Sequence, residues 1–204
     1  MRETEAEHMT NRKRQALESR RKIISASFKL ASQKGLENLT IQDICAAADV
    51  SVGAFYHHFK SKESLVLAWY ERVDGIFEGD VMPRLRAKDC STADKLIEFF
   101  RTIAVLSKRN GADYISQLYR AQCTVANGDE YCAGNALPCG LLELIETGQK
   151  VGDIRGDLDA VKLRDSLLLI VRGTLLDWAW RGCSYDVGER MDEMVRPYLD
   201  AMSA

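Results

Sequence analysis

The 204-residue sequence predicts an all-α protein, and three observations support this fold class. Apolar residues recur at spacings of three and four over most of the chain, which is the periodicity of an amphipathic helix. Only three prolines, Pro83, Pro138 and Pro197, interrupt it, so long intervals are free for helices. No segment of useful length alternates apolar and polar residues in the way that a half-buried strand does.

Residues 40–50 predict a short helix followed by a tight turn. Thr40 is a suitable N-cap, because its hydroxyl can accept a hydrogen bond from a backbone N–H in the first turn. The apolar residues of this helix form a single stripe, namely Ile41, Ile44, Cys45 and Ala48. Asp49 then breaks the pattern, and Asp tolerates the left-handed backbone that such a turn needs.

A second short helix is predicted from Val52 to Phe59. Ser51 is its N-cap, and Phe55 and Phe59, four residues apart, are its buried pair. Its first residues have small side chains, which would let the backbone approach the bases in a major groove about 12 Å wide. The pattern therefore favours DNA binding, although two short helices with a turn also occur in many other helical domains.

Charge is unevenly distributed along the chain, although the net charge is only −2. Residues 10–62 hold ten Lys or Arg against four acidic residues, whereas residues 63–204 hold seventeen against twenty-three. A basic N-terminal part fits the binding of phosphates at one end of the molecule. The alternative explanation is a solvated basic helix face.

Residues 23–65 resemble the N-terminal domain of the TetR family of transcriptional repressors. The matching positions lie in register, and they are Ile23, Ile24, Ser25, Ala26, Gly35, Leu39, Thr40, Ile41, Ile44, Ala47, Ala48, Val50, Ser51, Gly53, Tyr56, His58, Phe59, Lys62, Glu63 and Leu65. Asp49 departs from the family pattern, which usually has Gly there. The resemblance covers only the N-terminal part of the chain.

The resemblance implies a three-helix DNA-binding domain, with a first helix near residues 12–34 and a helix-turn-helix at 41–59. It also implies a helical regulatory domain, homodimerisation through the last two helices, and release from a palindromic operator when a small molecule binds. We therefore predict a flexible tail at 1–11, the DNA-binding domain at 12–62 and the regulatory and dimerisation domain at 63–204. The predicted DNA-contacting residues are Thr40, Ser51, Val52, Gly53, Ala54, Tyr56, His57, His58, Lys60 and Lys62.

The predicted recognition helix lacks the side chains that usually discriminate between bases. Val52, Gly53 and Ala54 offer no bidentate donor of the kind that Arg gives to guanine or Asn gives to adenine. His57 is the polar side chain available for base edges. We expect most affinity to come from phosphates, and selectivity to come from His57, thymine methyl groups and DNA shape.

The rest of the chain is predicted to form further helices. The periodic apolar segments run over residues 62–81, 92–108, 113–125, 136–151, 159–181 and 186–202. The helix that begins near Ser61 continues from the DNA-binding domain into the regulatory domain, and we expect it to transmit the signal between them.

Residues 166–181 are apolar nearly all round, which predicts a helix that is buried on two sides. We exclude a membrane span, because Arg172 and Asp177 interrupt a run that is already shorter than about 18 residues. One side can face the domain's own core and the other a second copy of the chain, with Gly173 allowing close approach. The predicted dimer-interface residues are Leu168, Val171, Leu175, Met191, Met194 and Val195.

A small-molecule site in the regulatory domain is predicted with less detail, because aromatic residues at helical spacing usually belong to the core. Arg172 must pair within its apolar segment, either with Asp165 or Asp177 of either subunit or with an acidic group of a ligand. The predicted ligand-binding residues are Phe100, Tyr114, Tyr119, Arg172 and Trp178.

The cysteines suggest a second hypothesis. Residues 1–22 contain no apolar signal segment, so we expect a cytoplasmic protein with reduced thiols. Cys123, Cys132 and Cys139 follow one another at spacings of nine and seven, and they would serve a thiol-based redox-sensing regulator. These spacings and the lack of a nearby His argue against zinc, and we predict no cofactor.

No catalytic arrangement of residues is recognisable, so we do not expect an enzyme. His57 and His58 belong to the predicted DNA face, and the glycines form no phosphate-binding loop. The sequence thus predicts a homodimeric repressor that responds to a small molecule and does not associate with membranes. An activator with the same DNA-binding domain is an alternative that the sequence does not separate from it.

Overall fold

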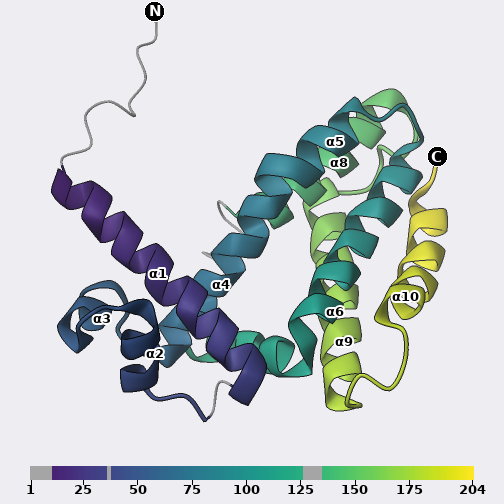
Figure 1. Cartoon of the computed structure of the whole chain (residues 1–204). Coiled ribbons are helices and arrows are strands. Elements are labelled where there is room, and N and C mark those ends of the chain that lie inside the picture. Colours follow the sequence, from purple (N-terminus) through teal and green to yellow (C-terminus); the bar gives the residue numbers. More distant parts are fainter. Residues whose placement is uncertain (1–10, 36–37, 126–134) are drawn as a thin grey trace, which may run out of the picture. The chain divides into compact units, whose positions relative to one another are not determined.

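The structure, a computed structural model, describes residues 11–35, 38–125 and 135–204 (Figure 1). Within these ranges every regular element is a helix, apart from an isolated antiparallel bridge between Ile154 and Ser203. The predicted all-α class is therefore confirmed. The chain divides into two compact units, Met1–Trp69, which we call the head, and Tyr70–Ala204, which we call the body.

The head contains three helices and the first part of a fourth. They are α1 (Asn11–Lys34), α2 (Ile41–Ala48), α3 (Val52–His58) and α4 (Lys62–Ile76). α1 packs on α2 and α3, and the three helices and α4 share one core made of Ile23, Ile44, Cys45, Ala48, Phe55, Phe59, Leu65 and Ala68. The last residue of the head, Trp69, donates its indole N–H to the Ser27 hydroxyl at 3.0 Å, which ties α4 to α1.

The body begins in α4 and continues as a series of helices. They are the π-helical turn η1 (Phe77–Val81), α5 (Met82–Ala87), α6 (Thr92–Val125), α8 (Ala136–Val151), α9 (Ala160–Trp180) and α10 (Val187–Met202). α6, α9 and α10 pack against one another, and α8 packs on α6 and α9 (Figure 1). In the described part of the chain, no helix is sufficiently long and apolar to cross a membrane.

The segment predicted to end at residue 81 continues into α5. Proline lacks a backbone N–H, but Pro83 lies in the first turn of α5, where a missing N–H removes no intrahelical hydrogen bond. Directly before it the chain takes a π-helical turn, after which the Met82 N–H donates to the Phe77 carbonyl five residues earlier.

α6 is interrupted at Gly111, whose φ of 81° and ψ of 172° are not helical. Such a backbone conformation is accessible essentially to glycine alone. The break falls between the two segments predicted at 92–108 and 113–125, so the prediction of two helical segments is confirmed. The bend matters for the site, because residues on both sides of it line the cavity described below.

The start of α8 is held by a residue from a distant part of the sequence. Asn135, the N-cap, makes no side-chain cap of its own. Instead the Asp74 carboxylate on α4 accepts hydrogen bonds from the backbone N–H groups of Ala136 and Leu137, both at 2.7 Å. This long-range cap fixes the start of α8 against the body part of α4.

Candidate nucleic-acid interface and ligand cavity

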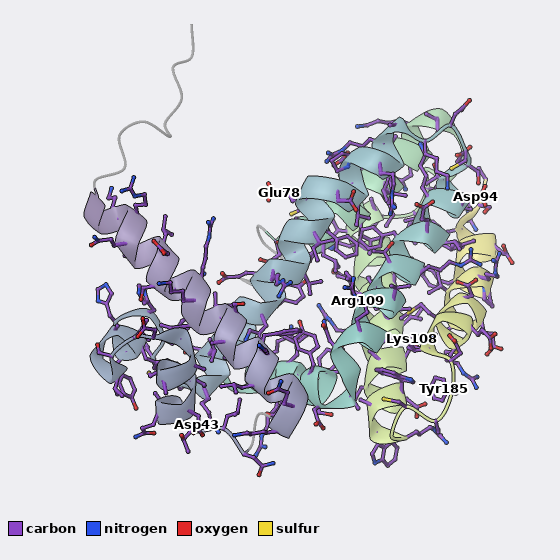
Figure 2. The ribbon with its side chains drawn as sticks, viewed as in Figure 1. Asp43, Glu78, Asp94, Lys108, Arg109 and Tyr185 are labelled. Atoms are coloured by element: carbon purple, nitrogen blue, oxygen red, sulfur yellow. The ribbon has the colours of Figure 1, made fainter. Side chains whose placement is uncertain are left out.

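The helix-turn-helix of the head begins with a capping box at Thr40. The Thr40 hydroxyl accepts from the backbone N–H of Asp43 at 3.0 Å, and the Asp43 carboxylate accepts from the backbone N–H of Thr40 at 3.0 Å. The Thr40 hydroxyl also donates to the Asp43 carboxylate at 2.8 Å. The backbone and side-chain hydrogen bonds that this carboxylate accepts from Thr40 lower the pKa of Asp43, which lies on α2 (Figure 2). The predicted N-cap is therefore confirmed, and it joins a reciprocal pair that the prediction did not include.

The turn between α2 and α3 also has the predicted geometry. Asp49 adopts the left-handed conformation, with φ 54° and ψ 53°, and its N–H closes the end of α2. The Ser51 hydroxyl caps α3 by accepting from the Ala54 N–H at 3.1 Å. Phe55 and Phe59 are buried with ring centroids 5.6 Å apart, as predicted, so one side of α3 is fixed to the core.

The opposite side of α3 is open to solvent. Tyr56 is 55% exposed and Val52 is 39% exposed. Gly53 and His57 are exposed as well, whereas Ala54 is half-buried. The predicted base-reading residues therefore lie mainly on an accessible surface, which we call the α3 face and define as Val52, Gly53, Tyr56 and His57.

Polar residues predicted to contact phosphates surround the α3 face. Thr40, Ser51 and Lys60 are exposed. The Lys62 ammonium donates to the Leu39 carbonyl at 2.9 Å, so it lies beside the start of α2. The residues predicted to bind DNA are thus collected around α3 and the two helix starts next to it.

His58, the remaining predicted DNA contact, is half-buried at the end of α3. Burial lowers its pKa, and the nearby charges of His57 and Arg20 lower it further. The Arg20 guanidinium lies over the Phe59 ring at 5.4 Å, which places a cation of α1 close to this end of α3.

The body contains a largely apolar cavity of about 70 Å³. Its walls come from α4, α6, α8 and α9, and they consist of Tyr70, Val73, Ile103, Leu106, Ser107, Asn110, Tyr114, Ile115, Leu118, Tyr119, Gln122, Leu137, Leu168, Val171, Arg172 and Leu175. Apolar pockets with a few polar groups are the usual form of a small-molecule site.

Three of the five predicted ligand residues line this cavity, namely Tyr114, Tyr119 and Arg172. Phe100 lies in the core with its ring 5.5 Å from that of Phe99. Trp178 is buried, and its indole N–H donates to the Tyr185 carbonyl at 3.0 Å. Phe100 and Trp178 are thus placed among core contacts and not among the residues that line the cavity.

Sequence reasoning missed most of the cavity walls. Ser107 and Asn110 line the cavity from before the break at Gly111 and Tyr114 from after it, so helical register from Tyr114 could not have indicated the first two. Tyr70 and Leu137 carry no local signal either. They reach the cavity only because α4 and α8 pack beside the other helices.

Five of the six predicted dimer residues are buried within the single chain. Leu168, Val171 and Leu175 line the chain's own cavity, and Met191 and Val195 are fully buried in the body core. They leave no surface for a partner chain. α9 has two apolar stripes, and the periodicity of its sequence did not indicate which stripe faces the core of its own chain.

The outward stripe of α9 carries Leu169, Gly173, Leu176 and Trp180, and Met194 of α10 lies beside it. Leu169 is 65% exposed, Trp180 is 84% exposed and Met194 is 48% exposed. Leu169, Gly173 and Met194 line a groove of about 490 Å³, to which Asp177, Arg181, Tyr185 and Arg190 also contribute. We call this the α9 groove.

Polar contacts hold the far end of the α9 groove together. Tyr185, in the loop between α9 and α10 (Figure 2), donates its hydroxyl to the Asp177 carboxylate at 3.0 Å. Burial and this carboxylate raise the pKa of Tyr185 to about 12. Arg181 pairs with Asp177 at 3.0 Å, and Arg190 lies over the Tyr185 ring at 5.3 Å.

The cysteines proposed for redox sensing are only partly described. Cys123 and Cys139 are free and exposed, and Cys132 lies outside the described residues. Among the residues that the structure describes, no group of His, Cys, Asp or Glu is arranged to hold a metal ion. The redox alternative therefore stays a prediction.

Comparison with known proteins supports the interpretation of the head. Residues 23–69 match the family model of the bacterial regulatory proteins, tetR family. The HTH-type transcriptional regulator YerO of Bacillus subtilis is 44% identical over 59 residues, which are 29% of this chain. The match covers 20% of YerO, so this chain spans only a fifth of the length of that relative.

Two longer matches include the body. The probable acrEF/envCD operon repressor of Escherichia coli is 24% identical over 205 residues, covering 90% of this chain and 86% of that protein. The crystal structure of FadR from Thermus thermophilus, a TetR family transcriptional repressor in complex with lauroyl-CoA, has a TM-score of 0.75 at 23% identity. That likeness covers 90% of this chain and 94% of the FadR chain, and it shows a shared fold.

Proposed function

We propose that this chain, whose N-terminal domain belongs to the tetR family of bacterial regulatory proteins, is a transcriptional regulator that binds double-stranded DNA. The observation that carries the proposal is the α3 face. It is exposed and begins with small residues, while Phe55 anchors the other side of the helix in the head core. A short, firmly held helix with this surface suits insertion into a major groove.

The contacts divide into two kinds. Tyr56, Lys60 and Lys62 are suited to phosphates, because a phenol and two ammonium groups donate hydrogen bonds to anionic oxygen. His57 is the polar side chain of the α3 face that is suited to base edges, while Val52 and Gly53 allow close approach and contact with thymine methyl groups. Affinity should therefore depend strongly on salt, and selectivity on His57 and on the fit of the groove.

Two alanine variants test this division. Bound genomic fragments are first selected with the full-length chain, and affinities for the best fragment and for random DNA are then measured by fluorescence anisotropy. His57→Ala should weaken operator binding by about 1–3 kcal/mol and random DNA much less, whereas Lys60→Ala should weaken both alike and reduce the salt slope by about one. Val105→Ala, an exposed position on α6, is the control.

The outcomes of this experiment are distinct. An equal loss on both DNAs for His57→Ala would show that His57 reads no base. Failure of the unaltered chain to select any DNA would contradict the proposed function itself.

We further propose that the regulator is a repressor and that a small molecule in the body cavity releases it from DNA. The E. coli relative is named a probable operon repressor, and the FadR structure is described as a repressor with a bound acyl-CoA. Deletion of the gene should raise expression of a reporter fused to the selected operator. A fall in expression would instead favour the activator alternative.

A palindromic operator requires two recognition helices about 34 Å apart, so we propose a homodimer that forms through the α9 groove. This surface holds both a groove and a protruding side chain that can fill the same groove on a second copy. Trp180 protrudes from α9, seven residues beyond Gly173, which lines the groove. In a two-fold contact the protruding side chain of each copy can fill the groove of the other. Gly173 suits this role, since nothing lies within 4 Å of a Cβ at that position.

Sedimentation velocity of the full-length chain tests the interface. Trp180→Ala combined with Leu169→Ala should convert the dimer into a monomer that keeps its helical circular dichroism, because exposed aromatic anchors dominate most interfaces. Val161→Ala is a matched control, since Val161 is 45% exposed on the same helix but does not line the groove. A double variant that stays dimeric would exclude this face.

A further inference from the structure

A buried hydroxyl lines the body cavity without a hydrogen bond to the protein. Ser107 of α6 is 5% exposed and belongs to the cavity wall, and among the residues that the structure describes no hydrogen bond uses its side chain. The buried hydroxyls of Ser27 and Thr174, by contrast, donate to the Ile24 and Ile170 carbonyls at 2.8 Å and 2.9 Å. Because an unpaired buried polar group is costly, the Ser107 hydroxyl indicates a partner inside the cavity.

A second neutral polar group lies on the same side of α6. Asn110 is three residues beyond Ser107, before the break at Gly111, and it also lines the cavity. A serine hydroxyl and an asparagine amide can each donate and accept hydrogen bonds. Together they can hold a hydroxyl group of a ligand, which donates one hydrogen bond and accepts another.

The apolar part of the wall favours an uncharged ligand. It includes Leu106 and Ile115 of α6 and Leu175 of α9. Two neutral hydrogen-bonding groups do not compensate for the hydration that a charged ligand loses on entering such a site. Arg172, the charged residue in the described part of the wall, already interacts with other groups of the protein.

Size limits the apolar remainder of the ligand. The cavity measures about 70 Å³. An apolar cavity known to hold benzene measures about 150 Å³. A single ring would therefore enter with modest side-chain movement, whereas a long acyl chain would need the helices to separate.

We propose that the effector of this regulator is a compact, uncharged molecule with a hydroxyl group, which hydrogen-bonds to Ser107 and Asn110 while its apolar part lies between α6 and α9. This inference rests on the proposed function, which makes the cavity the effector site. It adds the polar group of the ligand, its charge and an upper limit to its size. Ordered water is the alternative partner for Ser107, and the tests below distinguish the two.

The first test uses two matched pairs of probes. The melting temperature of the full-length wild-type chain is measured at pH 7 with phenol and toluene, which have nearly the same size, and with benzyl alcohol and benzoate. Phenol is uncharged at this pH, because a phenolic hydroxyl has a pKa of about 10. A purely apolar cavity would favour toluene, since the hydroxyl of phenol loses hydration on burial.

With Ser107 as its partner, phenol should raise the melting temperature more than toluene does. Benzyl alcohol should raise it more than benzoate does, because a ligand stabilises the folded state in proportion to its affinity. Dodecanol, which carries the same hydroxyl on a long chain, should stabilise less than phenol at equal concentration.

The second test uses variants of the polar wall, with affinities for phenol and toluene measured by titration calorimetry. Ser107→Ala should weaken phenol binding about fivefold, the effect of one neutral hydrogen bond, and leave toluene binding unchanged. Asn110→Leu should act in the same direction. Ser116→Ala, at an exposed serine of α6 that does not line the cavity, is the matched control and should change neither affinity.

The results separate this proposal from the proposed function. Stronger stabilisation by toluene than by phenol, or by benzoate than by benzyl alcohol, would overturn the assignment of an uncharged hydroxyl ligand. Unchanged phenol affinity in Ser107→Ala, or an equal loss for phenol and toluene, would show that Ser107 serves water or packing instead. Stronger stabilisation by dodecanol would overturn the size limit. DNA binding by the α3 face is measured separately, and if Ser107→Ala does not fold, the matched pairs on the wild-type chain decide.

Discussion

The head and the body build their candidate sites in different ways. The α3 face of the head depends on caps, a turn and a buried pair that all lie between Thr40 and Phe59. The cavity of the body takes its walls from α4, α6, α8 and α9, so residues as far apart as Tyr70 and Leu175 meet in it. A site within one helix-turn-helix can be located from sequence, whereas a site between several helices depends on how they pack.

The prediction with the largest expected effect asks whether the stability of the head depends only on the head's own core. Phe55 is fully buried in that core, so Phe55→Ala should cost about 3–5 kcal/mol. Hydrogen exchange followed by mass spectrometry should show loss of protection in α2 and α3, with α9 still protected. Tyr56→Ala, at the exposed neighbour, should change stability by no more than about 0.5 kcal/mol. Loss of protection in α9 would show that the two units unfold together.

A second prediction concerns the close packing around two glycines of α8 in the body. At Gly53 in the α3 face, by contrast, the atom that a Cβ would meet is Ser51 Oγ at 3.8 Å. A Cβ at Gly148 would lie 2.6 Å from Thr92 Cγ2 and 2.8 Å from Ile154 Cδ1, so Gly148→Ala should cost about 1–3 kcal/mol in urea denaturation. Gly140→Ala is the matched comparison. The three atoms nearest to its Cβ would all belong to the Met82 side chain, which is flexible and can move aside, so the cost should be smaller. A larger loss of stability for Gly140→Ala than for Gly148→Ala would mean that the Thr92 and Ile154 side chains move aside more readily than Met82.

The same contrast explains what the sequence could and could not predict. Thr40, Asp49, Ser51 and the pair of Phe55 and Phe59 were placed correctly, because each acts on neighbours within a few residues. The helices of the body were also located by their periodicity. For a helix that is apolar on two sides, periodicity does not indicate which side faces the core of its own chain. Leu168, Val171 and Leu175 were therefore assigned to a partner chain, although they line the chain's own cavity.

A third prediction compares a local cap with a long-range one. Thr40→Ala removes the hydroxyl that caps α2, and Asp74→Ala removes the carboxylate that caps α8 from α4. Each should cost about 0.5–2 kcal/mol in the full-length chain. The Thr40 cap lies within a peptide spanning residues 38–62, so Thr40→Ala should also lower the helicity of that isolated peptide, measured by circular dichroism, whereas the Asp74 cap on α8 needs α4 and exists only in the longer chain. Thr40→Ser should restore the cap, and a peptide that ignores both Thr40 variants would show that the cap depends on tertiary packing.

The smallest expected effect is a pH dependence confined to the head. The histidines of the chain are His8, His57 and His58, so the body has none. The pKa of His58 is lowered from 6.5, first by burial and then by the charges of His57 and Arg20. The unfolded chain therefore binds the proton more readily than the folded one. The contribution of His58 to stability is complete above pH 6.5 and is lost as the pH falls through the lower pKa of the folded state.

Two variants separate the causes of that shift. Urea denaturation between about pH 7.5 and 5.5 should show a decline in stability that His58→Gln flattens. His57→Gln should flatten it only in part, because burial is the larger cause and stays in place. Equal flattening by both variants would assign the shift to charge repulsion between the two rings. Protection of α9 from hydrogen exchange should stay constant over the same range if head and body are independent, because no histidine of the body titrates there.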